Sequence, residues 1–144
     1  MNKGLPETKN ENPVRVFYDA VASEYAERYF HEFDSKPFDR WILTRFADFM
    51  RPRGLVADMG CGPGEVARFL KDLGVDVIGV DLSSRMLGEA RRLNPDIEFL
   101  QGDILKLDLR DAHLEGIAAF YAIVHFTMDQ VQRAVVEFHR VLAS

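Results

Sequence analysis

The chain has 144 residues, a formal net charge of −5 and a hydrophobic content of 47%, which is typical of one globular domain with one core. An acidic chain lacks the basic face that binding to a phosphate backbone requires, so we expect no nucleic-acid partner. The single cysteine, Cys61, excludes an internal disulfide and a cysteine cluster for zinc. The sequence also holds no cleavable signal and no apolar run long enough to cross a bilayer, so we expect a cytoplasmic protein with no membrane partner.

The N-terminal third of the sequence predicts a tail and two helices. Residues 1–12 are polar, and we expect a flexible tail there, ahead of a single domain over residues 13–144. Residues 13–29 place apolar and aromatic side chains at three- and four-residue steps, which predicts an amphipathic helix. Residues 38–50 repeat this pattern, and Pro52 and Gly54 end it. We therefore expect a helical part over residues 13–54.

Strand and helix patterns alternate over the rest of the chain, residues 55–144. Short apolar runs predict strands at residues 55–60, 76–81, 97–103 and 116–126. Helical spacing predicts helices at residues 65–73, 84–93 and 128–142. This alternation is typical of βαβ units, so the sequence predicts an α/β core with a parallel sheet.

Three glycines, Gly60, Gly62 and Gly64, stand where the first strand turns into its helix. Glycine has no Cβ and tolerates backbone angles closed to other residues, so bare main-chain amides can line a ligand surface there. A dinucleotide fingerprint requires glycines at its first, third and sixth positions. Counting from Gly60, the sixth position is Glu65, and counting from Gly62 it is Ala67, which matches only the alanine variant.

The second of these registers leaves Asp58 and Gly60 unexplained, so a nicotinamide-dependent oxidoreductase is disfavoured. The pattern that fits is Asp-x-Gly-x-Gly-x-Gly, beginning at Asp58. Two further aspartates, Asp81 and Asp103, end the second and third predicted strands. Each alone could be a helix cap or a turn residue. Together with the glycines they predict a ligand site at the carboxyl ends of the strands.

The motifs "VADMGCGPG", "VIGVDLSSRML" and "FLQGDILKL" resemble those of class I S-adenosylmethionine-dependent methyltransferases of the small-molecule, type 11/25-like kind, and the resemblance extends over residues 14–142. It implies a Rossmann-like, doubly wound parallel sheet of strand order 3-2-1-4 after two N-terminal helices. It also implies S-adenosylmethionine as cofactor and a small-molecule methyl acceptor as partner. The C-terminal strands of the family's usual seven-stranded sheet are absent from this sequence. A truncated, non-catalytic S-adenosylmethionine-binding or assembly module is therefore the alternative.

The resemblance assigns the first motif to the methionine portion of the cofactor. Asp58 is expected to act through the ammonium end, directly or through water. The turn expected to wrap the methionine portion contains Gly60, Cys61, Gly62 and Gly64.

The other two motifs are assigned to the adenosine portion. Asp81 is expected to accept hydrogen bonds from both ribose hydroxyls, and Leu82 to lie against the adenine. Asp103 is expected to accept from the adenine amino group, while the main-chain amide of Ile104 donates to a ring nitrogen.

Aromatic residues supply the remaining candidates. The resemblance implies that Tyr18 and Tyr25 on the first helix contact the cofactor carboxylate or the acceptor, although a tyrosine stripe at helical spacing also suits a core. Phe120 is a candidate contact near the sulfonium, since an aromatic face favours a positive centre. His125 is a candidate catalytic base, and capping or packing beside the next helix is the alternative.

Two further expectations concern metals and assembly. The other histidines, His31, His113 and His139, show no metal-ligand spacing, so we predict no metal. The fourth strand is expected to leave an unprotected apolar edge, and such edges invite pairing. We therefore predict a homodimer through this edge, or an exchanged helix that covers it.

Overall fold

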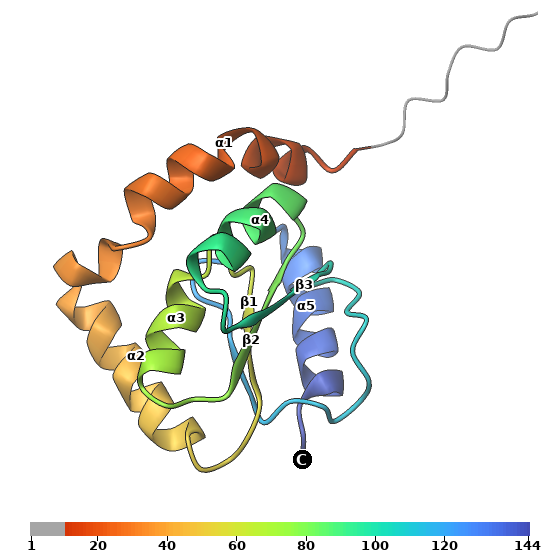
Figure 1. Cartoon of the computed structure of the whole chain (residues 1–144). Coiled ribbons are helices and arrows are strands. Elements are labelled where there is room, and N and C mark those ends of the chain that lie inside the picture. The colour runs from red at the N-terminus through yellow and green to blue at the C-terminus, as the bar shows by residue number, and fades with distance from the viewer. Residues whose placement is uncertain (1–10) are drawn as a thin grey trace, which may run out of the picture.

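A computed structural model describes residues 11–144. Its helices are α1 (Pro13–Tyr29), the short 3₁₀ helix η1 (Glu32–Ser35), α2 (Pro37–Met50), α3 (Glu65–Asp72), α4 (Ser84–Leu93) and α5 (Met128–Val141). Its strands are β1 (Val56–Met59), β2 (Val77–Asp81), β3 (Glu98–Gln101) and β4 (Gly116–Ala118). All pairs are parallel, in the order β3-β2-β1-β4, which confirms the predicted fold. Figure 1 shows helices on both sides of this sheet.

The helices begin at residues that satisfy free backbone amides. The side chain of Asn12 accepts hydrogen bonds from the amides of Val14 and Arg15, and Pro13 occupies the first helical position of α1. The predicted tail overlaps this cap, because Asn12 belongs to it, and residues 1–10 lie outside the described range. Thr127 begins α5 with a capping box completed by Gln130.

Two apolar clusters cover opposite faces of the sheet. The first joins β1 and β2 to α2, α3 and α4, and includes Val56, Val77 and Leu70. The second lies toward α5 and includes Ala57, Ile78 and Ala134. Neighbouring residues of one strand enter different clusters because side chains alternate along a strand. The result is a three-layer arrangement whose central strands β1 and β2 are buried on both sides.

The fourth strand is shorter than predicted. The apolar run at residues 116–126 was expected to be one strand, but only Gly116–Ala118 pairs with β1. Ala118 pairs with Asp58, and strand β1 continues for only one more residue, Met59, before the chain turns at Gly60. Residues beyond Ala119 therefore have no partner in β1 to extend the ladder. The rest of the run is apolar for another reason: Ala119, Ala122 and Phe126 pack against the second cluster.

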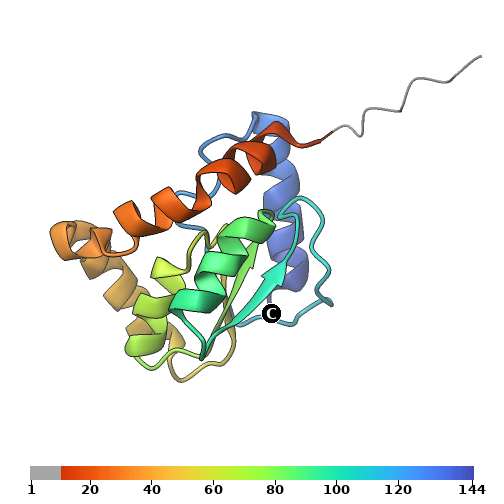
Figure 2. The same ribbon diagram turned by 45° about the horizontal axis from the view of Figure 1, so that its top comes forward.

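Helix α1 crosses the molecule at the end where the strands finish (Figure 2). Its buried residues are Ala22 and Ala26, which let it pack closely against α4. Hydrogen bonds join the two helices: the Ser83 hydroxyl donates to Asp19, and the Ser23 hydroxyl donates to Glu89. Polar contacts and small side chains therefore hold α1 against α4.

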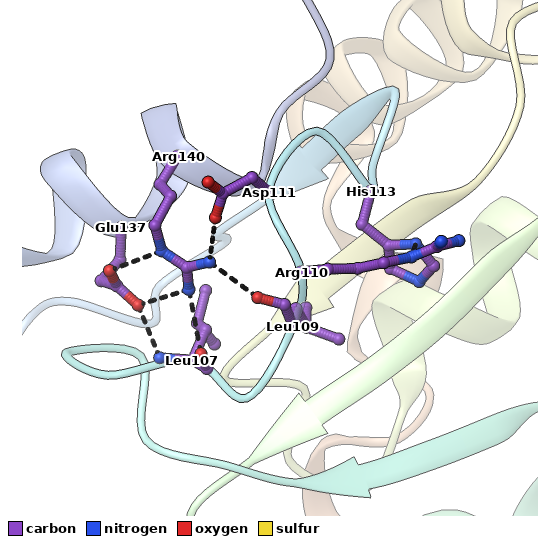
Figure 3. A network of polar contacts seen from close by, with 7 residues as sticks. All are labelled: Leu107, Leu109, Arg110, Asp111, His113, Glu137 and Arg140. Atoms are coloured by element: carbon purple, nitrogen blue, oxygen red, sulfur yellow. Dashed lines mark hydrogen bonds and ion pairs between the residues drawn. The ribbon is translucent and has the colours of Figure 1, made fainter.

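A single arginine ties the long connection between β3 and β4 to helix α5 (Figure 3). The Arg140 guanidinium donates to both carboxylate oxygens of Glu137, to the carboxylate of Asp111 and to the carbonyl oxygens of Leu107 and Leu109, over 2.7–3.0 Å. All five N–H groups of the guanidinium are used in these bonds. Glu137 also accepts from the Leu107 amide.

Replacing Arg140 with lysine should lower the melting temperature by about 4 °C or more, because an ammonium cannot bridge these separated acceptors. Differential scanning fluorimetry measures this effect. The matched control is Arg133→Lys, an exposed position on the same helix. Equal melting temperatures for the two variants would show that the bridge does not stabilise the fold.

Candidate functional site

A cavity of about 660 Å³ lies beyond the carboxyl ends of the strands. Its wall combines the first turns and the inner face of α1, part of η1, the glycine turn, the ends of β2 and β3, and residues after β4. Ligands of open α/β sheets bind in this position, and the volume suits a small-molecule site.

The glycine turn contributes Gly60 and Gly62 to the wall. Gly62 has a φ of +52°, and a Cβ built there would meet no atom within 4 Å. The backbone is therefore bare toward open space. The amide of Gly62 donates to Asp81 Oδ2 over 2.8 Å, which ties the turn to the end of β2.

The other predicted members of the first motif lie behind this turn. Asp58 is 1% exposed and does not line the cavity. Its carboxylate accepts a hydrogen bond of 3.0 Å from the Ala67 amide, and burial raises the pKa of this carboxyl well above its usual range. Asp58 thus joins β1 to α3. This position does not support a direct contact with a ligand's ammonium group.

Cys61 and Gly64 also do not line the cavity. Cys61 is buried in the first cluster, and burial raises the pKa of its thiol, which suits an inert packing residue. Gly64 caps α3 at a φ of +88°, and a Cβ there would lie 2.8 Å from Asn94 Nδ2 and 2.9 Å from Phe99 Cζ. Both residues therefore contribute to the packing and conformation of the turn and not to the cavity wall.

Asp81 and Leu82 line the cavity at the end of β2. The Asp81 carboxylate accepts from the amides of Gly62 and Ser83, each over 2.8 Å. Burial raises the pKa of Asp81, and the backbone hydrogen bonds oppose that rise. The carboxylate is thereby fixed in orientation, and its remaining lone pairs are available to a ligand.

Asp103 and Ile104 line the cavity just after β3. One carboxylate oxygen of Asp103 accepts from the Leu105 amide over 2.8 Å, and this side chain is exposed. Ile104 is 8% exposed and belongs to the second cluster. At this point of the cavity, the exposed carboxylate of Asp103 is a hydrogen-bond acceptor next to the buried apolar side chain of Ile104.

The tyrosine stripe of α1 faces the cavity and not the core. Tyr18, Tyr25 and Tyr29 all line it. The Tyr18 hydroxyl lies 3.0 Å from His125 Nε2, which connects α1 to the segment after β4. Burial raises the pKa of both Tyr18 and Tyr25. Helix α1 thus covers the cavity on one side.

The segment after β4 brings Phe120, Tyr121 and His125 to the wall. Phe120 packs against Phe33, with ring centroids 6.1 Å apart. Tyr121 adopts a φ of +57°, which is strained for a tyrosine, and its hydroxyl donates to Asp39 over 3.1 Å. Strained backbone of this kind clusters at ligand sites.

Sequence reasoning missed five charged residues of the wall: Glu11, Arg15, Glu32, Lys36 and Glu65. Lys36 Nζ donates to Glu32 over 2.7 Å. Glu65 begins α3, and within residues 11–144 its buried Oε2 atom has no hydrogen-bond partner. Burial raises the pKa of Glu65 to about 7. The only sequence signal for the position of Glu65 in the wall was that it directly follows the glycine run.

The described residues show neither a metal cluster nor a membrane-spanning segment. In residues 11–144, no three His, Cys, Asp or Glu side chains are grouped so as to hold a metal ion. The helices of that range are all too short or too polar to cross a bilayer.

Comparisons with known proteins agree on one family. A family described as "Methyltransferase domain" matches residues 56–144. Malonyl-[acyl-carrier protein] O-methyltransferase of Enterobacter lignolyticus is 38% identical over 87 residues, which cover 60% of this chain and 34% of that protein. Demethylmenaquinone methyltransferase of Chlorobaculum tepidum is 29% identical over 147 aligned positions, which cover 97% of this chain and 59% of that protein.

Solved structures agree with this result. The TehB-like SAM-dependent methyltransferase of Corynebacterium glutamicum superposes with a TM-score of 0.68 at 27% identity, covering 86% of this chain and 68% of that one. The chain spans about a third to three fifths of the length of the two curated relatives above. S-adenosylmethionine is the cofactor that the family implies. The family match covers more than half of the sequence, and the chain therefore belongs to the methyltransferase domain family.

Proposed function

We propose that this chain binds S-adenosylmethionine in the cavity at the carboxyl ends of its strands and transfers the methyl group to a small-molecule acceptor. The observation that carries the proposal is the bare glycine turn, which faces the same cavity as Asp81 and Asp103. A cofactor with a zwitterionic end, a ribose and an adenine needs three features in its site. These are a backbone that the zwitterionic end can approach, a hydrogen-bond acceptor for the ribose hydroxyls, and groups that bind the adenine. The cavity offers these features side by side.

The residues of the wall fit the parts of this cofactor. Asp81, oriented by two amides, accepts from the ribose hydroxyls. Asp103 accepts from the adenine amino group, while the Ile104 amide donates to the ring and Leu82 packs against it. Gly60 and Gly62 let the methionine portion approach the backbone.

The bound cofactor supplies an activated methyl group on a positively charged sulfur. Holding an acceptor in line with that methyl supplies much of the rate acceleration. Phe120 and Tyr25 provide aromatic faces for the sulfonium and the acceptor. His125, in contact with the Tyr18 hydroxyl, accepts a proton from an acceptor that must lose one.

Calorimetric titration with S-adenosylmethionine and its demethylated product tests the proposal. We expect micromolar dissociation constants for both compounds, with no binding of NADH in the same range. A folded chain that binds neither compound would overturn the proposal. A chain that binds both, yet transfers labelled methyl groups to no small-molecule acceptor, would favour the non-catalytic module.

Two finer expectations remain predictions. The homodimer would use the free side of β4, which pairs with β1 alone among the described strands. The observed strand offers only three residues for pairing, and sedimentation analysis would detect a dimer. The cytoplasmic location is predicted from composition and awaits fractionation of the producing cell.

A further inference from the structure

We propose that Glu65 is the carboxylate that binds the ammonium group of S-adenosylmethionine, in place of the strand-end aspartate expected from the sequence. This inference rests on the proposed function, because the ligand is the proposed cofactor. It assigns to Glu65 a binding role that the glycine motif by itself does not indicate.

The first step compares the acids around the glycine turn. Asp58 is enclosed behind the turn and is bonded to the Ala67 amide. Asp81 has both oxygens engaged by backbone amides. Glu65 differs from both, because its Oε2 atom is buried, lacks a partner among the described residues and belongs to a side chain that lines the cavity. A buried carboxylate oxygen without a partner is costly unless a ligand satisfies it.

The second step concerns the charges around Glu65. Glu32 from η1 and Asp81 from β2 make its ionisation less favourable, while Lys36, just before α2, favours it. Glu65 also lies close to three other titratable groups, and its charge raises the pKa of each. They are Asp58 from β1, Tyr25 from α1 and Cys61 from the turn. Among the groups that act on the ionisation of Glu65 in residues 11–144, the carboxylates of Glu32 and Asp81 outnumber the ammonium of Lys36. An added cation is therefore favoured at this end of the cavity.

The third step identifies which cation fits. Glu65 directly follows the glycine turn, whose Gly60 and Gly62 line the wall. The methionine portion of the cofactor would bind against this turn, and its ammonium is the group of that portion that would offer several hydrogen-bond donors. The sulfonium offers none, so an unsatisfied carboxylate oxygen selects the ammonium.

Glu65→Gln tests the inference, because it keeps the shape of the side chain and removes its charge. The probes are S-adenosylmethionine, its demethylated product, and 5′-methylthioadenosine, which retains adenosine but lacks the amino-acid end. We expect affinity for the first two to fall at least about tenfold, while affinity for methylthioadenosine changes less than about twofold. Glu65→Asp, which retains the charge on a shorter stem, should recover part of the loss.

The pH dependence gives a second readout. The pKa of Glu65 is about 7 in the free protein, so binding of the ammonium to its charged form weakens as pH falls through 7. The ligand's own amino group also titrates near this range, so the Glu65 contribution is read from the difference between the two proteins: the affinity ratio of wild type to Glu65→Gln for S-adenosylmethionine should fall between pH 8 and pH 6. Methylthioadenosine should show no such dependence in either protein.

The outcomes separate the two proposals. If the wild-type chain binds neither S-adenosylmethionine nor methylthioadenosine, the proposed function fails and the inference with it. If the wild type binds both and Glu65→Gln binds S-adenosylmethionine equally well, only the inference fails. A variant that loses affinity for methylthioadenosine to the same degree also overturns it, since the effect would not belong to the amino-acid end.

Discussion

Asp81→Ala should weaken S-adenosylmethionine binding by roughly 100-fold, or about 3 kcal/mol. The carboxylate is held by the amides of Gly62 and Ser83, so its free lone pairs are already oriented before a ligand arrives. Hydrogen bonds from two ribose hydroxyls to a charged acceptor are each worth about 1.5–3 kcal/mol. The loss of the Gly62 contact adds to the effect, because it frees the glycine turn. Calorimetric titration measures the change.

The matched control is Asp108→Ala, which removes an exposed aspartate outside the cavity wall. Its affinity should equal that of the wild type. Methylthioadenosine separates the two acidic sites, because it contains the ribose. Asp81→Ala should weaken its binding as strongly as that of S-adenosylmethionine, whereas Glu65→Gln should not. Unchanged binding by a folded Asp81→Ala protein would remove Asp81 from the site.

Gly64→Ala should reduce the free energy of unfolding by about 2 to 4 kcal/mol. The backbone at Gly64 has a φ of +88°, which is unfavourable for alanine, and the added Cβ would lie 2.8 Å from Asn94 and 2.9 Å from Phe99. Asn94 is itself buried, and its amide donates to the carbonyls of Pro63 and Ala90. It therefore has little room to move. Urea denaturation followed by circular dichroism measures the loss.

Gly62→Ala is the matched control, because Gly62 also has a positive φ of +52° but faces open space. Its unfolding free energy should fall by only about 1 kcal/mol, while its affinity for S-adenosylmethionine should fall because the new Cβ projects from the wall of the cavity. The two variants thus separate folding from binding. Equal stabilities would mean that contacts with Asn94 and Phe99 do not restrict position 64.

Much of the fold could be predicted from the sequence because its signals are local. Apolar runs and helical spacing predicted the five α-helices and the core of every strand in residues 11–144, and their alternation predicted the parallel sheet, whereas the 3₁₀ helix η1 was not predicted. The error lay in the fourth strand, where Ala119 and Phe126 looked like strand residues. An apolar run indicates burial but not strand pairing. These residues are buried by packing in the second cluster beside α5, although they form a loop and not a strand.

The candidate site was predicted less completely, for a physical reason. Asp81, Asp103 and the glycines stand at strand ends, where sequence position fixes spatial position. Asp58 stands at a strand end too, yet it is enclosed, because an aspartate on a central strand can bond to the helix behind the turn. Whether a carboxylate faces the cavity or the helix depends on side-chain direction, which motif spacing does not specify.

The sequence by itself determined the order of strands and helices, the glycine turn and the family of the chain, because backbone angles and hydrophobic periodicity are properties of short segments. Only the tertiary structure decided which groups share the cavity. It turned the tyrosines of α1 toward the site and brought Tyr18 within 3.0 Å of His125. It also left the Glu65 oxygen at the cavity wall without a hydrogen-bond partner from residues 11–144. Such contacts join residues far apart in the chain, and they form only when the helices pack over the ends of the strands.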